Sequence, residues 1–179
     1  KRIDPSKVLQ TVKSILVFGL NYFKKTAASE KLGTGKISRY AIGKDYHEII
    51  SAKLSQLTDF LKTLKPDIKA LYYSDTGPLM EKVLAQKAGL GWIGKNTNLI
   101  NTKKGSYFFL GCILTDLDLK YDKMESDHCG TCRKCIDACP TGAIVEPYQL
   151  NSSKCISYLT IEYRGEKIPK TFKGKFEGW

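Results

Sequence analysis

The chain has 179 residues, enough for one domain, or one domain with a small second module, and long enough to bury a hydrophobic core. Hydrophobic residues make up 42% of it and aromatic residues 11%, which excludes an intrinsically disordered chain. Lysine and arginine number 29 against 18 acidic residues, a net charge of +11 that favours a polyanionic partner such as nucleic acid. A basic, solvated surface without such a partner explains the charge equally well.

The first half of the chain alternates strand and helix patterns. Residues 15–20 form a short apolar run typical of a strand buried on both faces. Asp45 and Glu48 have the spacing of a capping box, and the helix they open has apolar residues every three or four positions until Pro66. Residues 68–73 predict a second strand.

The segment after this strand contains further helix and strand patterns. Pro78 suits the first turn of a helix over residues 79–88. Three glycines within residues 89–94 indicate a close backbone approach or unusual dihedral angles. Residues 99–101 and 106–114 predict two more strands joined by a turn. This alternation predicts an α/β layer with helices packed against a sheet.

Residues 129–140 read Cys-Gly-Thr-Cys-Arg-Lys-Cys-Ile-Asp-Ala-Cys-Pro. This is the ferredoxin-type run, in which three thiolates hold one cubane iron–sulfur cluster and the fourth ligates a neighbouring cluster. We therefore expect Cys129, Cys132 and Cys135 to share one 4Fe-4S cluster and Cys139 to belong to another. A zinc site is the alternative, since a Cys-x-x-Cys pair suits zinc, but the full spacing closed by Cys-Pro favours a cluster.

The thiol count leaves the second cluster open. Either Cys155 completes a single cluster, or it joins Cys139 in a second cluster whose other ligands lie beyond Trp179 in a longer natural chain. Cys112 lies inside an apolar run and is expected to be a packed core thiol. Because a cluster needs reduced thiolates, the cysteines predict a cytoplasmic protein.

The rest of the chain gives no sign of targeting. Lys1–Pro5 is not followed by the apolar core of a signal peptide, and the longest apolar run is too short to span a bilayer. No membrane anchor is expected. Arg39, Lys95 and the lysines of the C-terminal tail are candidates for contacts with nucleic-acid phosphates, against the alternative of a solvated surface.

Several motifs together resemble epoxyqueuosine reductase. They are Ser38–His47, Asp75–Glu81, Ala88–Asn96, the cysteine run continued to Ile144, and Cys155–Glu162. Members of this family reduce the epoxide of epoxyqueuosine in the wobble position of tRNA to queuosine, the final step of queuosine biosynthesis, with cobalamin and two 4Fe-4S clusters. The resemblance implies a cytoplasmic, monomeric oxidoreductase whose partners are the tRNA anticodon loop and an external electron donor.

The resemblance also implies a fold. The class is α/β (α+β), with a cobalamin-binding domain in residues 1–115 and a ferredoxin-like 4Fe-4S module in residues 116–179. The first domain is a corrinoid-binding sheet with flanking helices, similar to those of nitroreductases and reductive dehalogenases. Relative to the family, the chain is expected to lack an N-terminal segment, the second cysteine motif after Trp179 and a C-terminal helical region that helps to bind tRNA.

The site residues implied by the resemblance belong to both parts. Asp75 is the proton donor and a cofactor contact. The corrinoid contacts are Leu99, Leu110 and Ser157. The cluster ligands are Cys129, Cys132 and Cys135 for the first cluster and Cys139 and Cys155 for the second.

Asp75 also suits this role chemically. Removing an epoxide oxygen needs electrons and a proton on the departing oxygen, and a carboxylic acid at a strand end can supply that proton if burial raises its pKa. The structural alternative is a turn or helix cap before Pro78.

Two other functions are consistent with parts of the sequence. A ferredoxin-like electron carrier would need the clusters only, but the glycine-rich α/β portion before residue 116 is larger than a carrier requires. A corrinoid dehalogenase is the other alternative, and neither the N-terminus nor the basic charge suits an exported enzyme of that kind.

Overall fold

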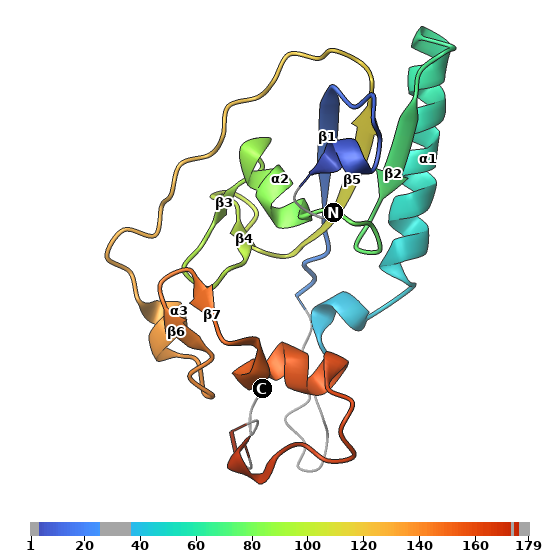
Figure 1. Cartoon of the computed structure of the whole chain (residues 1–179). Coiled ribbons are helices and arrows are strands. Elements are labelled where there is room, and N and C mark those ends of the chain that lie inside the picture. The colour runs from blue at the N-terminus through green and yellow to red at the C-terminus, as the bar shows by residue number, and fades with distance from the viewer. Residues whose placement is uncertain (1–3, 26–36, 173, 176–179) are drawn as a thin grey trace. The chain divides into compact units, whose positions relative to one another are not determined.

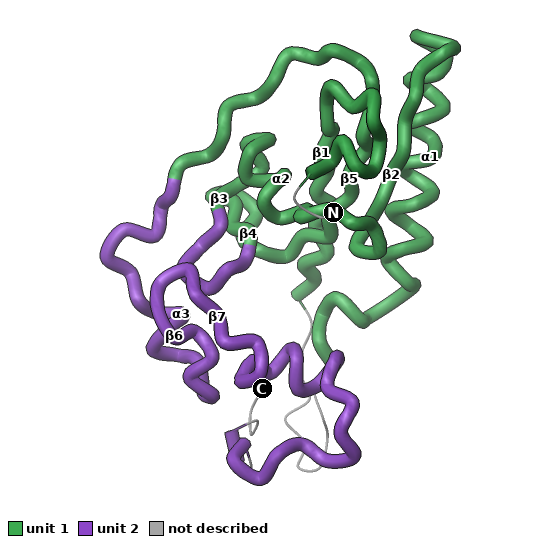
Figure 2. Tube along the Cα trace, viewed as in Figure 1, with its two compact units in different colours: residues 1–92, 99–126 green, residues 93–98, 127–179 purple. Residues whose placement is uncertain are grey.

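The structure is a computed structural model that describes residues 4–25, 37–172 and 174–175. It divides into two compact units, residues 1–92 with 99–126 (unit 1) and residues 93–98 with 127–179 (unit 2), coloured separately in Figure 2. Within the described ranges, no helix has the length and apolar character needed to cross a membrane. The predicted domains were defined by the ligands that they would bind, cobalamin and iron–sulfur clusters, and their assignment stays a prediction.

Unit 1 is built on a three-stranded sheet with the order β1-β5-β2. The strands are β1 (Ser14–Asn21), β2 (Ala70–Tyr73) and β5 (Phe108–Thr115), and both outer strands run antiparallel to β5 (Figure 1). Successive side chains of β5 alternate between the two faces, so Ile113 faces one layer while Cys112 and Leu114 face the other. All three are 0% exposed, so β5 is covered on both sides.

The first predicted strand is confirmed, and its predicted burial on both faces is confirmed only in part: its side chains pack against the core on both faces, but most of them are half-buried. β1 is an edge of this sheet, and apart from Ser14 its residues are half-buried or exposed. An apolar run does not distinguish an edge strand from a central one, because that difference depends on pairing with a strand far away in the sequence. The strand with fully buried side chains on both faces is β5.

The helix α1 (Tyr46–Leu64) packs on the Ile113 face of the sheet. It begins where the capping pattern predicts, since the Asp45 carboxylate accepts a hydrogen bond from the backbone N–H of His47 at 2.9 Å. Its residues Ile50 and Leu54 are buried against β5 and form the core on this side.

The helix α2 (Glu81–Lys87) packs on the opposite face, against β1 and β5. The predicted helix over residues 79–88 begins too early, because Met80 is the N-cap residue and Pro78 lies in the preceding loop. Leu79 is only 5% exposed and belongs to the core. Because Leu79 is buried in the core, this part of the chain forms a loop where the sequence predicted the first turn of the helix.

The glycine-rich segment leads into a second, smaller sheet. A Cβ atom on Gly91 would lie 2.2 Å from the carbonyl oxygen of Ile100, which confirms the predicted close backbone approach. The strands β3 (Trp92–Ile93) and β4 (Leu99–Ile100) form this sheet. The two predicted strands at 99–101 and 106–114 therefore exist, but they belong to different sheets, separated by a turn that the Asn101–Gly105 bridge closes.

Unit 2 has little regular structure. It contains α3 (Lys134–Asp137) and a hairpin of β6 (Ile144–Glu146) and β7 (Gln149–Leu150). Asn151 is followed by a 3-10 turn (Ser152–Lys154) and then by a π-helix (Tyr158–Glu162) that buries Leu159. Further 3-10 turns of the chain are Pro5–Lys7, Arg39–Ala41 and Lys170–Phe172.

Candidate functional site

The cysteine run of unit 2 is a loop around the short helix α3. Cys129 precedes a turn in which the N–H of Cys132 donates to the Cys129 carbonyl at 2.9 Å, and Cys135 lies on α3. All the cysteines of the chain are free thiols. Cys132 is exposed, and Cys129, Cys135, Cys139 and Cys155 are half-buried. The predicted ligands are thus accessible to an incoming cluster.

Two of the predicted ligand sulfurs accept hydrogen bonds from the backbone. The Sγ of Cys129 accepts from the N–H of Lys95 at 3.4 Å, and the Sγ of Cys139 accepts from the N–H of Ala143 at 3.2 Å. Partial burial acts to raise the pKa of the Cys139 thiol, but hydrogen bonds from Ile144, Thr141 and Ala143 outweigh it and lower that pKa. Such N–H groups stabilise thiolate sulfur, the form that binds iron.

The loop that carries the first thiols is braced by side chains that the sequence analysis did not assign to it. The Lys95 ammonium donates to the carbonyls of Gly130 and Cys132 at 2.5 and 2.9 Å. Lys95 therefore acts within the loop in this structure, although its charge made it a candidate for phosphate contact. The glycine-rich sequence around Lys95 (residues 91–96) indicated a special role for this segment. The carbonyl groups that Lys95 contacts could be identified only from the fold.

Asp127 holds the same loop from its N-terminal side. Its carboxylate accepts hydrogen bonds from the N–H of Cys129, at 2.7 Å, and from the hydroxyl of Tyr148. The hydrogen bond to Asp127 raises the pKa of Tyr148 to about 12, and the same bond lowers the pKa of Asp127. Tyr148 thus remains a donor across the physiological pH range.

The donor set fits an iron–sulfur cluster by its chemistry: four thiols at ferredoxin spacing, with N–H groups directed at two sulfurs. Among the described residues, no three metal-ligating side chains already converge on one point. Metal binding and local folding are coupled, so we expect the cysteine side chains to close around the cluster as it forms.

We expect replacement of Lys95 by methionine to make the cluster more labile, because the loop would lose two hydrogen bonds from a charged donor. Iron release to a chelator under anaerobic conditions should become about tenfold faster, which corresponds to an activation free energy lower by roughly 1.4 kcal/mol after the two hydrogen bonds are lost. Lys134→Met removes an exposed lysine of α3 and is the matched control. Equal release rates in the two variants would contradict the bracing role.

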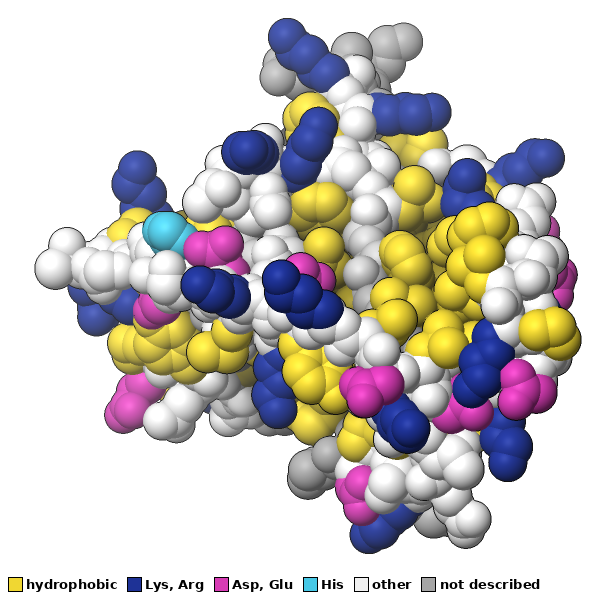
Figure 3. Space-filling view, turned by 90° about the horizontal axis from the view of Figure 1, so that it is seen from above, with side chains coloured by type: hydrophobic (Ala, Val, Ile, Leu, Met, Phe, Trp, Pro, Cys, Tyr) yellow, Lys and Arg dark blue, Asp and Glu magenta, His cyan; other side chains and the backbone are white. Residues whose placement is uncertain are grey.

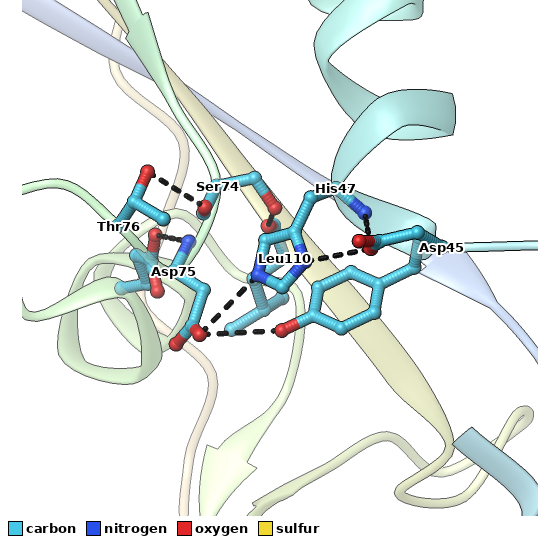
Figure 4. Close-up of polar contacts among 8 residues, drawn as sticks. Asp45, His47, Ser74, Asp75, Thr76 and Leu110 are labelled. Carbon is cyan, nitrogen blue, oxygen red and sulfur yellow. Dashed lines mark hydrogen bonds and ion pairs between the residues drawn. The ribbon is translucent and has the colours of Figure 1, made fainter. Parts of the chain in front are cut away.

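Asp75 occupies the loop that follows β2 in unit 1 (Figure 4). The preceding residue, Ser74, is 5% exposed and its hydroxyl donates to the carbonyl of Leu110 on β5 at 2.8 Å, which ties the loop to the central strand. Asp75 itself has a φ of 61°, and its N–H donates to the Glu81 carboxylate at 2.6 Å. Its side chain is 67% exposed, so the burial that the sequence analysis required of a proton donor is not found.

Two side chains from the start of α1 meet the Asp75 carboxylate. The Tyr46 hydroxyl donates to Oδ2 at 3.2 Å, and Nε2 of His47 lies 3.5 Å from the same oxygen. On the far side of the imidazole, Nδ1 of His47 is 2.7 Å from Oδ1 of Asp45 (Figure 4). The imidazole therefore bridges two carboxylates. The sequence alone assigned no role to His47.

A stack of aromatic rings supports this cluster. Tyr22 stacks on Phe109 with centroids 4.3 Å apart, Phe109 stacks on Tyr46 at 4.1 Å, and Tyr46 stacks on the His47 ring at 3.9 Å. The stack starts at the sheet and ends beside Asp75. Because each ring is held by the next, the imidazole has little freedom to turn away from the carboxylate.

A cavity of about 290 Å³ lies beside the stack. Its basic lining residues are Lys24, Arg39 and Lys44. The Arg39 guanidinium lies 5.5 Å from the ring centroids of both Phe23 and Tyr107. Elsewhere, on the face in Figure 3, basic side chains are spread singly among acidic and apolar ones. Cations beside aromatic rings are a combination suited to a nucleotide.

The neighbours of Asp75 have shifted pKa values. Burial and the charge of Asp75 raise the pKa of Tyr46 well above its ordinary value. Desolvation acts to lower the pKa of His47, but its contacts with Asp45 and Asp75 outweigh that and raise the pKa. His47 is therefore protonated over a wider pH range than a free histidine.

The other predicted corrinoid contacts are distributed over both units. Leu110 is half-buried on β5 and linked to the Asp75 loop through Ser74. Leu99 is 5% exposed and belongs to the buried core. Ser157 is exposed and belongs to unit 2. Of these residues, the structure brings together Asp75 and Leu110.

Comparison with known proteins gives matches over the whole chain. The family model for epoxyqueuosine reductase QueG (DUF1730) matches residues 2–76, and the model for a 4Fe-4S double cluster binding domain matches residues 128–179. The epoxyqueuosine reductase of Cellulophaga algicola is 48% identical over 179 residues, all of this chain and 58% of that protein. That of Synechocystis sp. is 47% identical over all of this chain and 62% of that protein.

Solved structures agree with these matches. An epoxyqueuosine reductase from Bacillus subtilis, described with its catalytic aspartate loop swung out of the active site, is 38% identical with a TM-score of 0.89 over 97% of this chain and 46% of that one. An epoxyqueuosine reductase with an epoxyqueuosine-modified tRNA-Tyr stem loop is 39% identical, with a TM-score of 0.88 over 98% of this chain and 47% of that one.

The ferredoxin-type cysteine run and the matching double-cluster model define the class of the molecule: it is part of an iron–sulfur protein. The identities over the entire chain then relate it to one family. The chain is similar over its whole length to epoxyqueuosine reductases, and it spans about three fifths of the curated relatives it matches, 58% and 62% of their lengths.

Proposed function

We propose that this chain belongs to an enzyme that reduces epoxyqueuosine to queuosine in the wobble position of tRNA, the last step of queuosine biosynthesis. The observation that carries the proposal is the identity of 48% over the whole chain to an epoxyqueuosine reductase. That region includes both the Asp75 loop and the complete Cys129–Pro140 run. Because the chain spans only part of its relatives, the activity is that of the longer protein.

In this proposal, the cysteines of unit 2 hold the 4Fe-4S clusters. Cys129, Cys132 and Cys135 hold the first, and Cys139 and Cys155 contribute to the second. An external electron donor delivers electrons to these clusters. The N–H groups of Lys95 and Ala143 stabilise the thiolates, and the Lys95 and Asp127 side chains keep the loop in place.

Residues 1–115 form the cobalamin-binding domain of the proposal, with a sheet of the nitroreductase and reductive-dehalogenase type. Asp75 and Leu110 suit a ligand at this position, because Ser74 ties them together and both reach solvent. Leu99 and Ser157 complete the proposed contacts. When bound, cobalamin would supply low-valent cobalt for a two-electron reduction.

Asp75 donates the proton to the departing epoxide oxygen in this proposal, because an alkoxide is a poor leaving group. Support comes from its position at the end of β2, held by Ser74 and Glu81, and from the catalytic aspartate loop described for the B. subtilis relative. The strained φ of 61° is typical of functional loops. The turn role and the donor role are compatible.

The substrate of the proposal is a tRNA anticodon loop in the cytoplasm, and the protein acts as a monomer. A relative has been solved with an epoxyqueuosine-modified tRNA stem loop. In this chain, the cavity lined by Tyr22 and Tyr46 has aromatic rings for a base and the cations Lys24, Arg39 and Lys44 for phosphates.

The test is reconstitution of the whole natural protein. It is loaded anaerobically with iron, sulfide and cob(II)alamin, reduced, and incubated with epoxyqueuosine tRNA, and nucleosides are analysed by mass spectrometry. Conversion to queuosine with a perturbed cobalt signal in electron paramagnetic resonance is the expected result. Intact clusters without cobalamin affinity or conversion would contradict the proposal and favour the electron-carrier alternative.

A further inference from the structure

Deoxygenation of an epoxide requires more protons than one carboxyl group holds. The conversion of an epoxide to an alkene and water consumes two electrons and two protons. One proton is needed when the first carbon–oxygen bond breaks, and another when the oxygen leaves as water. An Asp75 carboxyl supplies one proton at a time, so it must be recharged within each turnover.

Two groups beside Asp75 carry protons. The Tyr46 hydroxyl and His47 Nε2 both contact Oδ2, at 3.2 and 3.5 Å. Burial raises the pKa of Tyr46 above its ordinary value, so the phenol retains its proton and can only orient the carboxylate. An imidazolium such as that of His47 loses its proton much more readily than a phenol does. Of the two, His47 is the group that can release a proton.

The position of His47 suits repeated transfer. Its Nδ1 is 2.7 Å from Oδ1 of Asp45, and its ring stacks on Tyr46 at 3.9 Å, so Nε2 is directed toward Asp75. The side chain is 36% exposed, which gives water access to the ring for reprotonation. A carboxylate that orients an imidazole and stabilises its charged form is a recurrent device in acid–base catalysis.

We infer that His47 is the positioning residue that recharges Asp75 with protons during the reaction. In each transfer the N–H bond at Nε2 breaks and an O–H bond forms at Oδ2 of Asp75. The new carboxyl then passes its proton to the departing oxygen. His47, left as a neutral imidazole with Nδ1–H donating to Asp45, takes a proton at Nε2 from water. The two electrons come from the external donor, and the inference rests on the proposed function.

The charged and titratable groups around His47 give the direction of the pH dependence. Asp45 caps the start of α1 and Tyr46 is the first residue of that helix. Asp75 faces His47 from the loop after β2, and Glu81 of α2 accepts a hydrogen bond from the Asp75 N–H. The acids favour the imidazolium, so relay capacity is full below the pKa of His47. Turnover should fall as pH rises through that pKa, because the imidazolium is lost.

The test uses the whole natural protein loaded with clusters and cobalamin, with His47→Gln and His47→Ala. We expect kcat to fall about 10²-fold at neutral pH, the alkaline decline expected of the wild type to be absent, and KM for tRNA to change little. Added imidazole should restore turnover in His47→Ala, and more acidic substituted imidazoles should follow a Brønsted dependence. Lys53→Gln, an exposed charge on the same helix, should match the wild type.

Wild-type pH dependence in an active His47→Gln enzyme would overturn the inference, as would a uniform loss of rate in both variants without rescue or a changed pH profile.

A second measurement does not depend on activity. The His47 signal of protein labelled with ¹³C-histidine is titrated by NMR in the wild type and in Asp75→Asn. The His47 pKa should fall in the variant, and an unchanged value would overturn the contact. Failure of wild-type conversion with a normal NMR shift would contradict the proposed function instead.

Discussion

Replacing Asp75 with asparagine should lower the rate of epoxyqueuosine reduction by about 10²- to 10⁴-fold, the usual range for loss of a general acid. The amide keeps the shape of the side chain but has no transferable proton. Asparagine also tolerates positive φ values, so the loop conformation at φ 61° should survive. Single-turnover conversion of the modified tRNA by the whole loaded protein measures the effect.

The control for this prediction is Asp59→Asn. Asp59 is an exposed carboxylate on α1 that pairs with Lys62 at 3.1 Å, and it lies several turns away from the start of the helix, where Tyr46 and His47 contact Asp75. Loss of the Asp59 carboxylate should leave conversion unchanged. Iron content and reduction of the clusters should be normal in both variants, because the cysteine loop belongs to unit 2. An Asp75→Asn enzyme that retains wild-type turnover would show that another group donates the proton.

Replacing Cys132 with serine should abolish turnover, because the first cluster loses one of its three thiolates in the run. If the protein binds two four-iron clusters, the iron content should fall by about half. Iron analysis and electron paramagnetic resonance of the reduced protein measure this outcome. A variant that keeps full iron content would contradict the assignment of Cys132 as a ligand.

Cys112→Ala is the matched control. The Cys112 thiol is 0% exposed on β5, and burial raises its pKa to about 12, so it does not provide a thiolate. This variant should keep its iron and its spectrum, with a modest loss of stability of about 1 kcal/mol from the missing sulfur.

Cys155→Ser resolves the open ligand count. Loss of the same signal as in Cys132→Ser would place Cys155 in the first cluster, and loss of the other signal would place it with Cys139.

The parts of the fold that follow from local signals were predictable. The Asp45 cap and the apolar spacing of α1 specify where that helix starts and which turn faces the core, because neighbours on one helix face are three or four residues apart. The apolar run of β5 likewise predicted a buried strand and a core thiol at Cys112. By contrast, the start of α2 depended on burial of Leu79, which no local pattern reveals.

The candidate site divides in the same way. The cysteine run was readable because ligand spacing within one loop is a property of the sequence. Asp75 was readable as the residue at the end of a strand. The role inferred for His47 was not, because its three partners come from residue 45, residue 46 and a loop almost thirty residues later. Lys95 was similarly hidden, since its partners lie on the distant loop at Gly130 and Cys132.

The sequence by itself therefore determined the class of cofactor, the presence of α1, α2 and the three strands of the main sheet, and the likeness to a family, since these depend on residue type and on spacing along the chain. Only the tertiary structure decided that β5 is the central strand, that Asp75 is two-thirds exposed, and that an imidazole stands between two carboxylates. The physical reason is that strand pairing, exposure and proton-transfer distances arise from contacts between segments far apart in sequence, which packing of the whole unit selects.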